Sequence, residues 1–346
     1  MKKTMILLSI VLMIVFVSCE STAPENKIKT PDEMSWTVDT FRTAPTDIQL
    51  IPKDMIAFSP KDVWIAFYSG GLTECVQHYN GKEWYGYKRG QVGVIINALE
   101  GKSSHDIWAV GYFGNGPSIT HYDGMSWTPY SERWTEELID ITKDDEGNYW
   151  ACGRSGLILK YSKGKWESQR IKINLNSTKK EGFWLKSIVN YKNKIHVLAN
   201  LSGDGILASY HFVGKDNDWA VVDSFRYPET NLVKFGKLKF VVIDNKLYSC
   251  GDLGVYKFNN NTWTQILNAP YQFQDLCGIN ENYLIAVGYL DKAYFYNGIN
   301  WQQITKPFRG ETMSDALYTC WTNGKETFLG AMLWNERGVA VVFHGK

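Results

Sequence analysis

The chain alternates apolar and polar residues in short runs, with the two-residue period of strands that bury one face. Residues 106–130 show the pattern best. DIWAVGYF and SITHY are strand-like runs, and Asp123-Gly124 provides a tight turn before Trp127 opens another run. A run at 92–98 completes a unit of four antiparallel strands. Variants of this unit recur along most of the chain, so the sequence predicts an all-β repeat protein.

The outer hairpin of each unit has an aromatic residue, a turn and then a tryptophan. Six copies recur at intervals of roughly 38 to 53 residues, a spacing typical of β-propeller blades. The pairs are Tyr79 and Trp84, Tyr122 and Trp127, Tyr161 and Trp166, Phe212 and Trp219, Phe258 and Trp263, and Tyr296 and Trp301.

A seventh copy is split between the two ends of the chain. FHGK, beginning at Phe343, lacks the tryptophan, and MSW, ending at Trp36, lacks the aromatic residue. We therefore predict a monomeric, seven-bladed β-propeller with four-stranded antiparallel blades. The N-terminal strand closes the last blade, through pairing of residues 35–40 with 338–344. The alternatives are an open repeat array or a two-sheet sandwich, in which matching half-units at both ends would be coincidental.

The N-terminus reads MKKTMILLSIVLMIVFVSC, two lysines before an apolar run and a cysteine. This resembles a bacterial lipoprotein signal, which implies residues 1–19 as signal peptide and Cys19 as the lipid-modified residue. The polar, proline-containing residues 20–33 are expected to form a flexible tether, and 34–346 the propeller. The alternative is ordinary cleavage and a free periplasmic protein. We thus expect a cell-envelope location, lipid-anchored at the outer membrane and facing either the periplasm or the surface.

The net charge indicates which classes of partner to expect, and the cysteine count indicates whether disulfides are needed. The net charge is +1, and loss of Lys2 and Lys3 lowers it by two, so a nucleic-acid partner is not expected. We expect membrane contact only through the N-terminal lipid. Beyond Cys19 the chain has five cysteines, an odd number, and we interpret all five as small buried apolar residues.

The repeated unit WAVG followed by Y-x-G-x-x-W resembles the tryptophan-rich propeller lipoproteins of Gram-negative bacteria. Residues 142–150, TKDDEGNYW, loosely resemble the repeats of bacterial sensor and regulator propellers and the aspartate boxes of sialidase-like propellers. These resemblances imply the fold and leave the activity open.

In such a blade, strands a to d run outward from the axis. The b–c loops and the connectors between blades share one face, which carries the more variable loops. Their aromatic and charged side chains suit a sugar or peptide ligand, although the same residues also fit a role as blade caps and solvated charges. The candidate ligand-binding residues are Tyr112, Phe113, Trp134, Arg154, Asp204, Asp252, Tyr289, Asp291, Trp334, Glu336 and Arg337.

Enzyme signatures such as HExxH, GxSxG, CxxC and phosphate-binding glycine loops do not occur in the sequence. His78, His121 and His211 occupy one repeated slot, and equivalent slots in different blades cannot converge on a metal ion. We therefore expect no cofactor, no metal and no catalytic residues.

The leading hypothesis is a non-catalytic envelope lipoprotein that binds a glycan, a peptide or a partner protein on its loop-rich face. The alternative is a carbohydrate-active hydrolase or lyase that uses carboxylates of that face. A third hypothesis is a structural subunit of an envelope complex.

Overall fold

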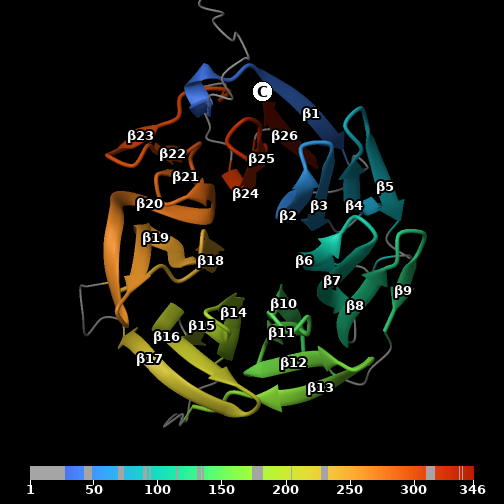
Figure 1. Cartoon of the computed structure of the whole chain (residues 1–346), viewed down its shortest axis with the longest axis vertical. Coiled ribbons are helices and arrows are strands. Elements are labelled where there is room, and N and C mark those ends of the chain that lie inside the picture. Colours follow the sequence, from blue (N-terminus) through green and yellow to red (C-terminus); the bar gives the residue numbers. More distant parts are fainter. Residues whose placement is uncertain are drawn as a thin grey trace, which may run out of the picture.

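The computed structural model describes residues 28–42, 49–68, 74–88, 92, 95–113, 116–130, 134, 136–173, 182–203, 205–226, 233–308, 316–334, 336 and 338–346. These residues form 26 strands and the short 3-10 helix η1 (Pro31–Glu33). The strands make six antiparallel sheets arranged around a central axis, with β2, β6, β10, β14, β18 and β24 nearest to it (Figure 1).

Five of the sheets have four strands each. The first three contain β2 (Ile51–Ser59), β3 (Asp62–Tyr68), β4 (Glu74–Tyr79) and β5 (Trp84–Lys88); β6 (Ile95–Ser103), β7 (Asp106–Phe113), β8 (Gly116–Tyr122) and β9 (Trp127–Pro129); and β10 (Leu138–Lys143), β11 (Tyr149–Gly153), β12 (Leu157–Ser162) and β13 (Lys165–Arg170). The other two contain β14 (Gly182–Tyr191), β15 (Lys194–Gly203), β16 (Gly205–Lys215) and β17 (Asp218–Arg226); and β24 (Ala316–Thr322), β25 (Thr327–Met332), β26 (Val339–Gly345) and β1 (Trp36–Arg42).

The sixth sheet has six strands. It contains β18 (Lys239–Ile243), β19 (Lys246–Asn259), β20 (Thr262–Asn280), β21 (Tyr283–Gly288), β22 (Ala293–Tyr296) and β23 (Trp301–Gln303). The prediction of seven four-stranded blades is therefore wrong. The cause is β20, whose first half pairs with β19 and whose second half pairs with β21. Its central residues, NAPYQF, leave no separate connector between two predicted blades, so the strand continues from one to the next.

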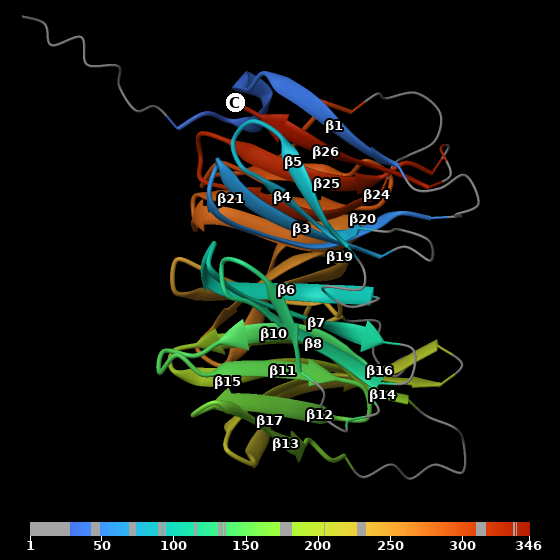
Figure 2. The same cartoon turned by 90° about the vertical axis from the view of Figure 1, so that its right-hand side faces the viewer.

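The closure of the ring also differs from the predicted one. β1 lies along β26, as Figure 2 shows, with Trp36 opposite Gly345 and Val38 opposite Phe343. In the predicted unit Trp36 would instead face Phe343. No covalent turn joins these two strands, so side-chain packing sets the register. A Cβ at Gly345 would lie 3.0 Å from the Trp36 ring, which shows how closely the indole covers this glycine.

The recurring aromatic pairs form hairpins as expected in most sheets. Five of them place the aromatic residue directly opposite its tryptophan: Tyr79 and Trp84, Tyr122 and Trp127, Tyr161 and Trp166, Phe258 and Trp263, and Tyr296 and Trp301. The sixth pair, in which two extra residues separate Phe212 from Trp219, differs, because Trp219 faces Gly214 and Phe212 faces Val221. These rings, with the inward residues of strands b and c, fill the core between neighbouring sheets.

The repeated histidines serve this packing. His78 bonds to Asp62 at 2.8 Å and stacks on Trp64, and His121 bonds to Asp106 at 2.7 Å. His196 and His211 bond to each other at 2.8 Å, and burial lowers the pKa of His211 to about 3. Within the described ranges, His, Cys, Asp and Glu form no group of three or more that could hold a metal ion.

Two further features bear on the sequence predictions. Cys75, Cys152, Cys250, Cys277 and Cys320 are all buried and unbridged, which confirms their interpretation as small core residues. Among the described residues, no helix has the length and apolar character needed to cross a membrane.

Candidate functional site

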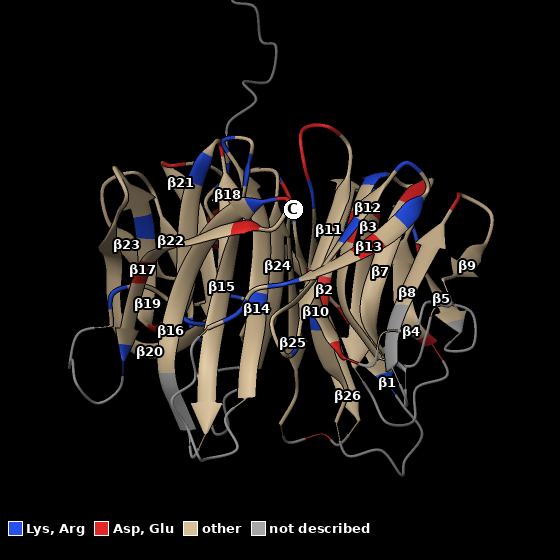
Figure 3. Ribbon diagram, turned by 90° about the horizontal axis from the view of Figure 1, so that it is seen from below, with Lys and Arg blue, Asp and Glu red and all other residues tan. Residues whose placement is uncertain are grey.

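A cavity of about 400 Å³ lies on the axis of the ring, at the ends where the inner strands begin. This is also the face of the b–c loops, which we call the mouth face. Figure 3 shows charged positions at the turns and also inside the ring beside β2 and β10. The lining residues are Ile51, Pro52, Lys53, Asp54, Asn97, Ala98, Glu137, Ile139, Asp140, Trp184, Lys186, Leu238, Lys239, Gln274, Tyr289 and Tyr318.

β-Bulges on the inner strands produce much of this lining. In β2 the pairing with β3 jumps from Pro52 to Asp54, so Lys53 is an extra, unpaired residue of the ladder. The same shift occurs at the start of β6, β10, β14, the inner part of β20, and β24. A bulge interrupts the regular alternation of side chains, so two successive residues can face the axis. The extra residues, all of which line the cavity, are Lys53, Asn97, Ile139, Lys186, Gln274 and Tyr318.

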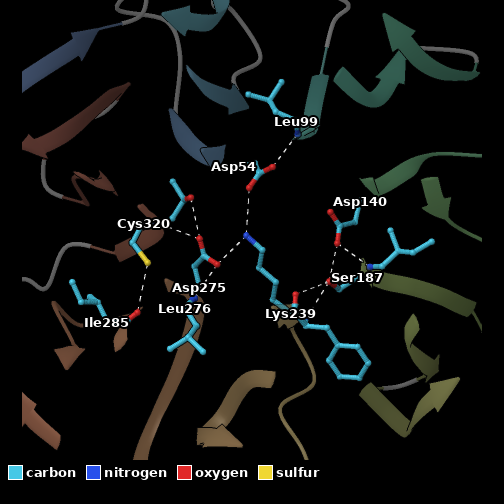
Figure 4. A network of polar contacts seen from close by, with 12 residues as sticks. Asp54, Leu99, Asp140, Ser187, Lys239, Asp275, Leu276, Ile285 and Cys320 are labelled. Carbon is cyan, nitrogen blue, oxygen red and sulfur yellow. Dashed lines mark hydrogen bonds and ion pairs between the residues drawn. The ribbon is translucent and has the colours of Figure 1, made fainter. Parts of the chain in front are cut away.

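One residue further along, charged side chains close the floor of the cavity. The Lys239 ammonium lies 3.3 Å from Asp54 and 2.9 Å from Asp275, and so joins three inner strands (Figure 4). Burial alone would lower the Lys239 pKa, but the charges of Asp275, Asp54 and Asp140 hold it well above its ordinary value. We call Asp54, Asp140, Lys239 and Asp275 the constriction.

The constriction residues also connect neighbouring sheets through the backbone. An oxygen of Asp54, of Asp140, of Asp275 and of the neighbouring Ser187 accepts a hydrogen bond from a backbone N–H on the next inner strand, as Figure 4 shows. The pairs are Leu99 N to Asp54 (2.9 Å), Ile188 N to Asp140 (2.9 Å), Phe240 N to the Ser187 hydroxyl (3.1 Å) and Cys320 N to Asp275 (3.1 Å). These side chains satisfy buried donors, so their first role is to hold the ring together.

Below the constriction a second cavity of about 330 Å³ continues along the axis. Asp54, Asp140 and Lys239 line both cavities and therefore separate them. Three carboxylates share one lysine here. Burial raises the pKa of Asp140 to about 6, and in the second cavity it raises that of Glu100 to about 7.

Two lysines at the mouth behave differently from Lys239. Among the described residues, the Lys53 and Lys186 ammonium groups make no hydrogen bond or ion pair, and each lies only over a ring, Tyr68 at 5.7 Å and Trp184 at 5.8 Å. Burial lowers the pKa of both, and the charge of Lys186 lowers that of Lys53 further. The Lys53 side chain is exposed. It faces the central channel, however, where protein atoms take the place of much of the water that would surround the ammonium group on an open surface.

Glu137, whose charge acts on both lysines, already has partners. Glu137 lies 3.2 Å from Arg154 and accepts a hydrogen bond from Asn97 at 3.0 Å. The Arg154 guanidinium in turn stacks on Trp184, 3.8 Å from its ring centre. The charge of Glu137 raises the pKa of both lysines without an ion pair to either among the described residues. The mouth therefore combines two cations that make no ion pair in the described part of the chain with the flat walls of Trp184, Tyr289 and Tyr318.

Only some of the site residues predicted from the sequence lie at the cavity. Tyr289 lines the cavity and packs against Tyr318, with 5.8 Å between ring centres, and Arg154 contacts the lining residues Glu137 and Trp184. Asp252 forms an ion pair with Lys237. Glu336, in a different loop of the mouth face, forms one with Arg42 at 3.3 Å. Tyr112, Trp134, Asp291 and Trp334 lie outside the cavity lining. Cys19, Asp204 and Arg337 lie outside the described residues, as does the side chain of Phe113.

Sequence reasoning missed the lysines and carboxylates of the inner strands. The signal that could have found some of them is a pair of adjacent polar residues early in an inner run, where a strand with one buried face should alternate. Lys53-Asp54, Lys186-Ser187 and Gln274-Asp275 are such pairs, and each lies at a bulge.

Comparisons with known proteins support the fold and little more. YCF48 bound to D1 peptide matches with a TM-score of 0.59 and 15% identity, over 89% of this chain and 96% of that one. Virginiamycin B lyase from Staphylococcus aureus matches at 0.60 and 11%, over 89% and 99%. The extracellular domain of BT4673 from B. thetaiotaomicron matches at 0.62 and 12%, over 89% of this chain and 40% of that one.

One curated relative matches in sequence. The immune protein Tsi7 of Pseudomonas aeruginosa is 26% identical over 110 residues, so the match spans 30% of this chain and about a third (35%) of that protein. No family model matches the chain. The structural neighbours are β-propellers with varied functions, and the chain has the β-propeller fold.

Proposed function

We propose that the protein is a non-catalytic, peptide-binding propeller of the cell envelope, and that its cavity takes a carboxylate of the bound peptide. The observation that carries this proposal is the pair of mouth lysines, Lys53 and Lys186, which line the cavity and make no ion pair among the described residues, and whose pKa is lowered despite the charge of Glu137. A cation that is partly desolvated and makes no ion pair is unfavourable, and a ligand carboxylate would offset this while gaining charge-assisted hydrogen bonds.

The walls of the cavity favour a peptide over a neutral glycan. Trp184, Tyr289 and Tyr318 offer flat apolar surfaces, and Asn97 and Gln274 offer amide groups that can bond to a peptide backbone. A neutral sugar would leave both ammonium groups unpaired. That YCF48 binds a peptide on a similar fold is consistent with this choice.

The envelope location rests on the N-terminal sequence. MKKTMILLSIVLMIVFVSC, with Cys19 as the lipid-modified residue, supports lipid anchoring, and the likeness to an extracellular domain agrees with a location outside the cytoplasm. Labelling cells with a radioactive fatty acid tests this part separately. Label in the wild type and none in Cys19→Ser is expected, whereas equal label in both would contradict it.

Fluorescence anisotropy with two peptide probes tests the binding proposal. The acidic probe is dansyl-Gly-Ser-Gly-Asp with a free C-terminus, and the neutral probe is dansyl-Gly-Ser-Gly-Asn amide. We expect the wild type to bind the acidic probe, to bind it more weakly at high salt, and to lose at least about tenfold in affinity in the Lys53→Gln/Lys186→Gln variant. The control is Lys82→Gln, an exposed turn lysine of the opposite face.

Three results would overturn the proposal. One is equal affinity for the acidic and neutral probes. Another is unchanged affinity in the double variant. The third is release of a product from a peptide or an oligosaccharide by the wild-type protein, which would instead favour the hydrolase or lyase alternative.

A further inference from the structure

Three exposed apolar side chains stand on b–c turns of the mouth face. Leu253 is 42% exposed, Leu290 52% and Trp334 53%. Leu253 lies at the bend of β19, Leu290 between β21 and β22, and Trp334 between β25 and β26. These turns follow one another around one side of the ring (Figure 1). We call the three residues the apolar arc.

The two leucines hold an unfavourable backbone conformation. Leu253 has φ of 64° and Leu290 has φ of 63°, in the left-handed region where a Cβ clashes with its own backbone. The other described non-glycine residues with positive φ are Ser, Lys, Asn or Asp, mostly at turns of the opposite face. Asparagine or glycine would fit these turns better. A strained backbone that displays an apolar side chain to water indicates a role in binding.

The arc is continuous with the cavity. Tyr289, which precedes Leu290, lines the cavity wall. Asp252, which precedes Leu253, accepts a hydrogen bond from Gln272 at 2.6 Å, and Gln272 accepts one from the cavity residue Gln274 at 3.0 Å. A ligand that fills the cavity and extends along this side of the mouth would therefore reach the arc.

The cavity floor limits how a peptide can enter. Asp54, Lys239 and Asp275 close the channel, so a chain cannot thread through and must end inside or turn back. A free C-terminus meets this condition and supplies the carboxylate for the mouth lysines. An extended chain rises about 3.3 Å per residue, so seven residues upstream of the terminus span about 23 Å.

We propose that the mouth lysines and the apolar arc together recognise the C-terminal segment of a partner protein, with its terminal carboxylate in the cavity and apolar side chains upstream on Leu253, Leu290 and Trp334. This inference rests on the proposed function. A membrane surface is the competing occupant, but lipid would not supply a chain end for the closed cavity beside the arc.

The test uses the Leu253→Asn/Leu290→Asn variant, since asparagine tolerates the left-handed conformation and should not harm folding. Its matched control is Met125→Ser, at a turn of the opposite face where the side chain is 87% exposed. The probes are dansyl-Leu-Ser-Leu-Ser-Gly-Ser-Gly-Asp, the same peptide with serine in place of leucine, and the short acidic probe, all with free C-termini.

We expect the wild type to bind the leucine probe at least about tenfold more tightly than the serine probe, and the double asparagine variant to lose that preference. Affinity for the short acidic probe should not change in this variant. Equal affinity for the leucine and serine probes would overturn the role of the arc while leaving the cavity proposal intact. Failure of every acidic probe to bind would overturn the proposed function itself.

Two further results bear on the occupant. Binding to the C-terminal amide of the leucine probe as strong as to its acid would overturn recognition of the chain end. Sedimentation with phosphatidylethanolamine–phosphatidylglycerol vesicles, by protein lacking residues 1–27, that is lost in the asparagine variant would show that the arc contacts lipid, and would overturn the peptide assignment.

Discussion

The mouth and the constriction both carry lysines on inner strands, but their surroundings differ. Lys239 sits between Asp54 and Asp275, with hydrogen-bonding distance to the second. Lys53 and Lys186, at bulge positions one residue nearer the mouth, have aromatic neighbours and make no ion pair among the described residues. Lysines at depths that differ by one strand position therefore have different roles. Lys239 holds sheets together, whereas Lys53 and Lys186, which make no ion pair within the described ranges, are the charges that we propose for ligand binding.

The two regions also differ in how burial acts on the pKa. At the constriction, neighbouring carboxylates more than compensate the burial of Lys239 and raise its pKa. At the mouth, burial prevails, and the pKa of Lys53 and of Lys186 is lowered. The first arrangement stabilises the folded state, whereas the second destabilises it slightly.

The largest expected effect is that of Lys239→Met. Removal of the ammonium leaves Asp54, Asp140 and Asp275 close together without a cation, and we expect a loss of about 3–5 kcal/mol in the free energy of unfolding. Urea denaturation at pH 7 measures it. Lys215→Met is the matched control, because Lys215 is equally exposed (29% against 28%), but its partner Glu146 is 56% exposed. The control should lose at most about 1 kcal/mol, and equal losses would contradict a structural role specific to the constriction.

Asp140→Asn should change the pH dependence of stability. The folded-state pKa of Asp140 is about 6, above the ordinary value of 3.8, so its proton binds more tightly to the folded state. The resulting stabilisation is present at low pH and is lost as pH rises through about 6. The variant should lack this dependence, which amounts to at most about 3 kcal/mol between pH 4 and 7. Parallel stability curves of variant and wild type over this range would show that Asp140 does not titrate as described.

The smallest effect is expected at the mouth. Lys53→Gln/Lys186→Gln removes two cations whose charged forms are disfavoured by desolvation. The free energy of unfolding at pH 7 should therefore stay the same or rise by less than about 1 kcal/mol, and the melting temperature should not fall. Differential scanning calorimetry gives the comparison with the wild type. A loss as large as that of Lys239→Met would mean that these lysines hold the ring together, and the contrast between the two regions would fail.

The strands could be predicted from the sequence, because alternation and turn residues are local signals. The aromatic pairs even gave the register of five outer hairpins, since a tight turn fixes which residues face each other. The number of sheets could not be predicted in this way. The split in the pairing of β20 depends on contacts with β19 and β21 and leaves no turn signal in the sequence.

The site was harder to predict than the fold. Bulges place Lys53 and Asp54, or Ile139 and Asp140, on the axis together, whereas a reading by alternation assigns one of each pair to the opposite face. The sequence-predicted site residues were therefore on the loops. Of these, Tyr289 lines the cavity, whereas Asp252 is paired with Lys237 and Glu336 with Arg42. That Lys53 and Lys186 make no ion pair with the described residues could not be predicted, because the ion pairs depend on how the sheets assemble into the ring.

The most direct measurement of the central claim is the titration of the mouth lysines with and without ligand. Reductive methylation with ¹³C labels each lysine amine, and NMR follows its pKa, with Lys53→Gln and Lys186→Gln used to assign the signals. In the free protein both should titrate below the exposed lysines, and saturation with the acidic probe should raise both pKa values, because a carboxylate favours the charged amine. Two signals that titrate with the exposed lysines, or that do not move when the probe is added, would contradict the account.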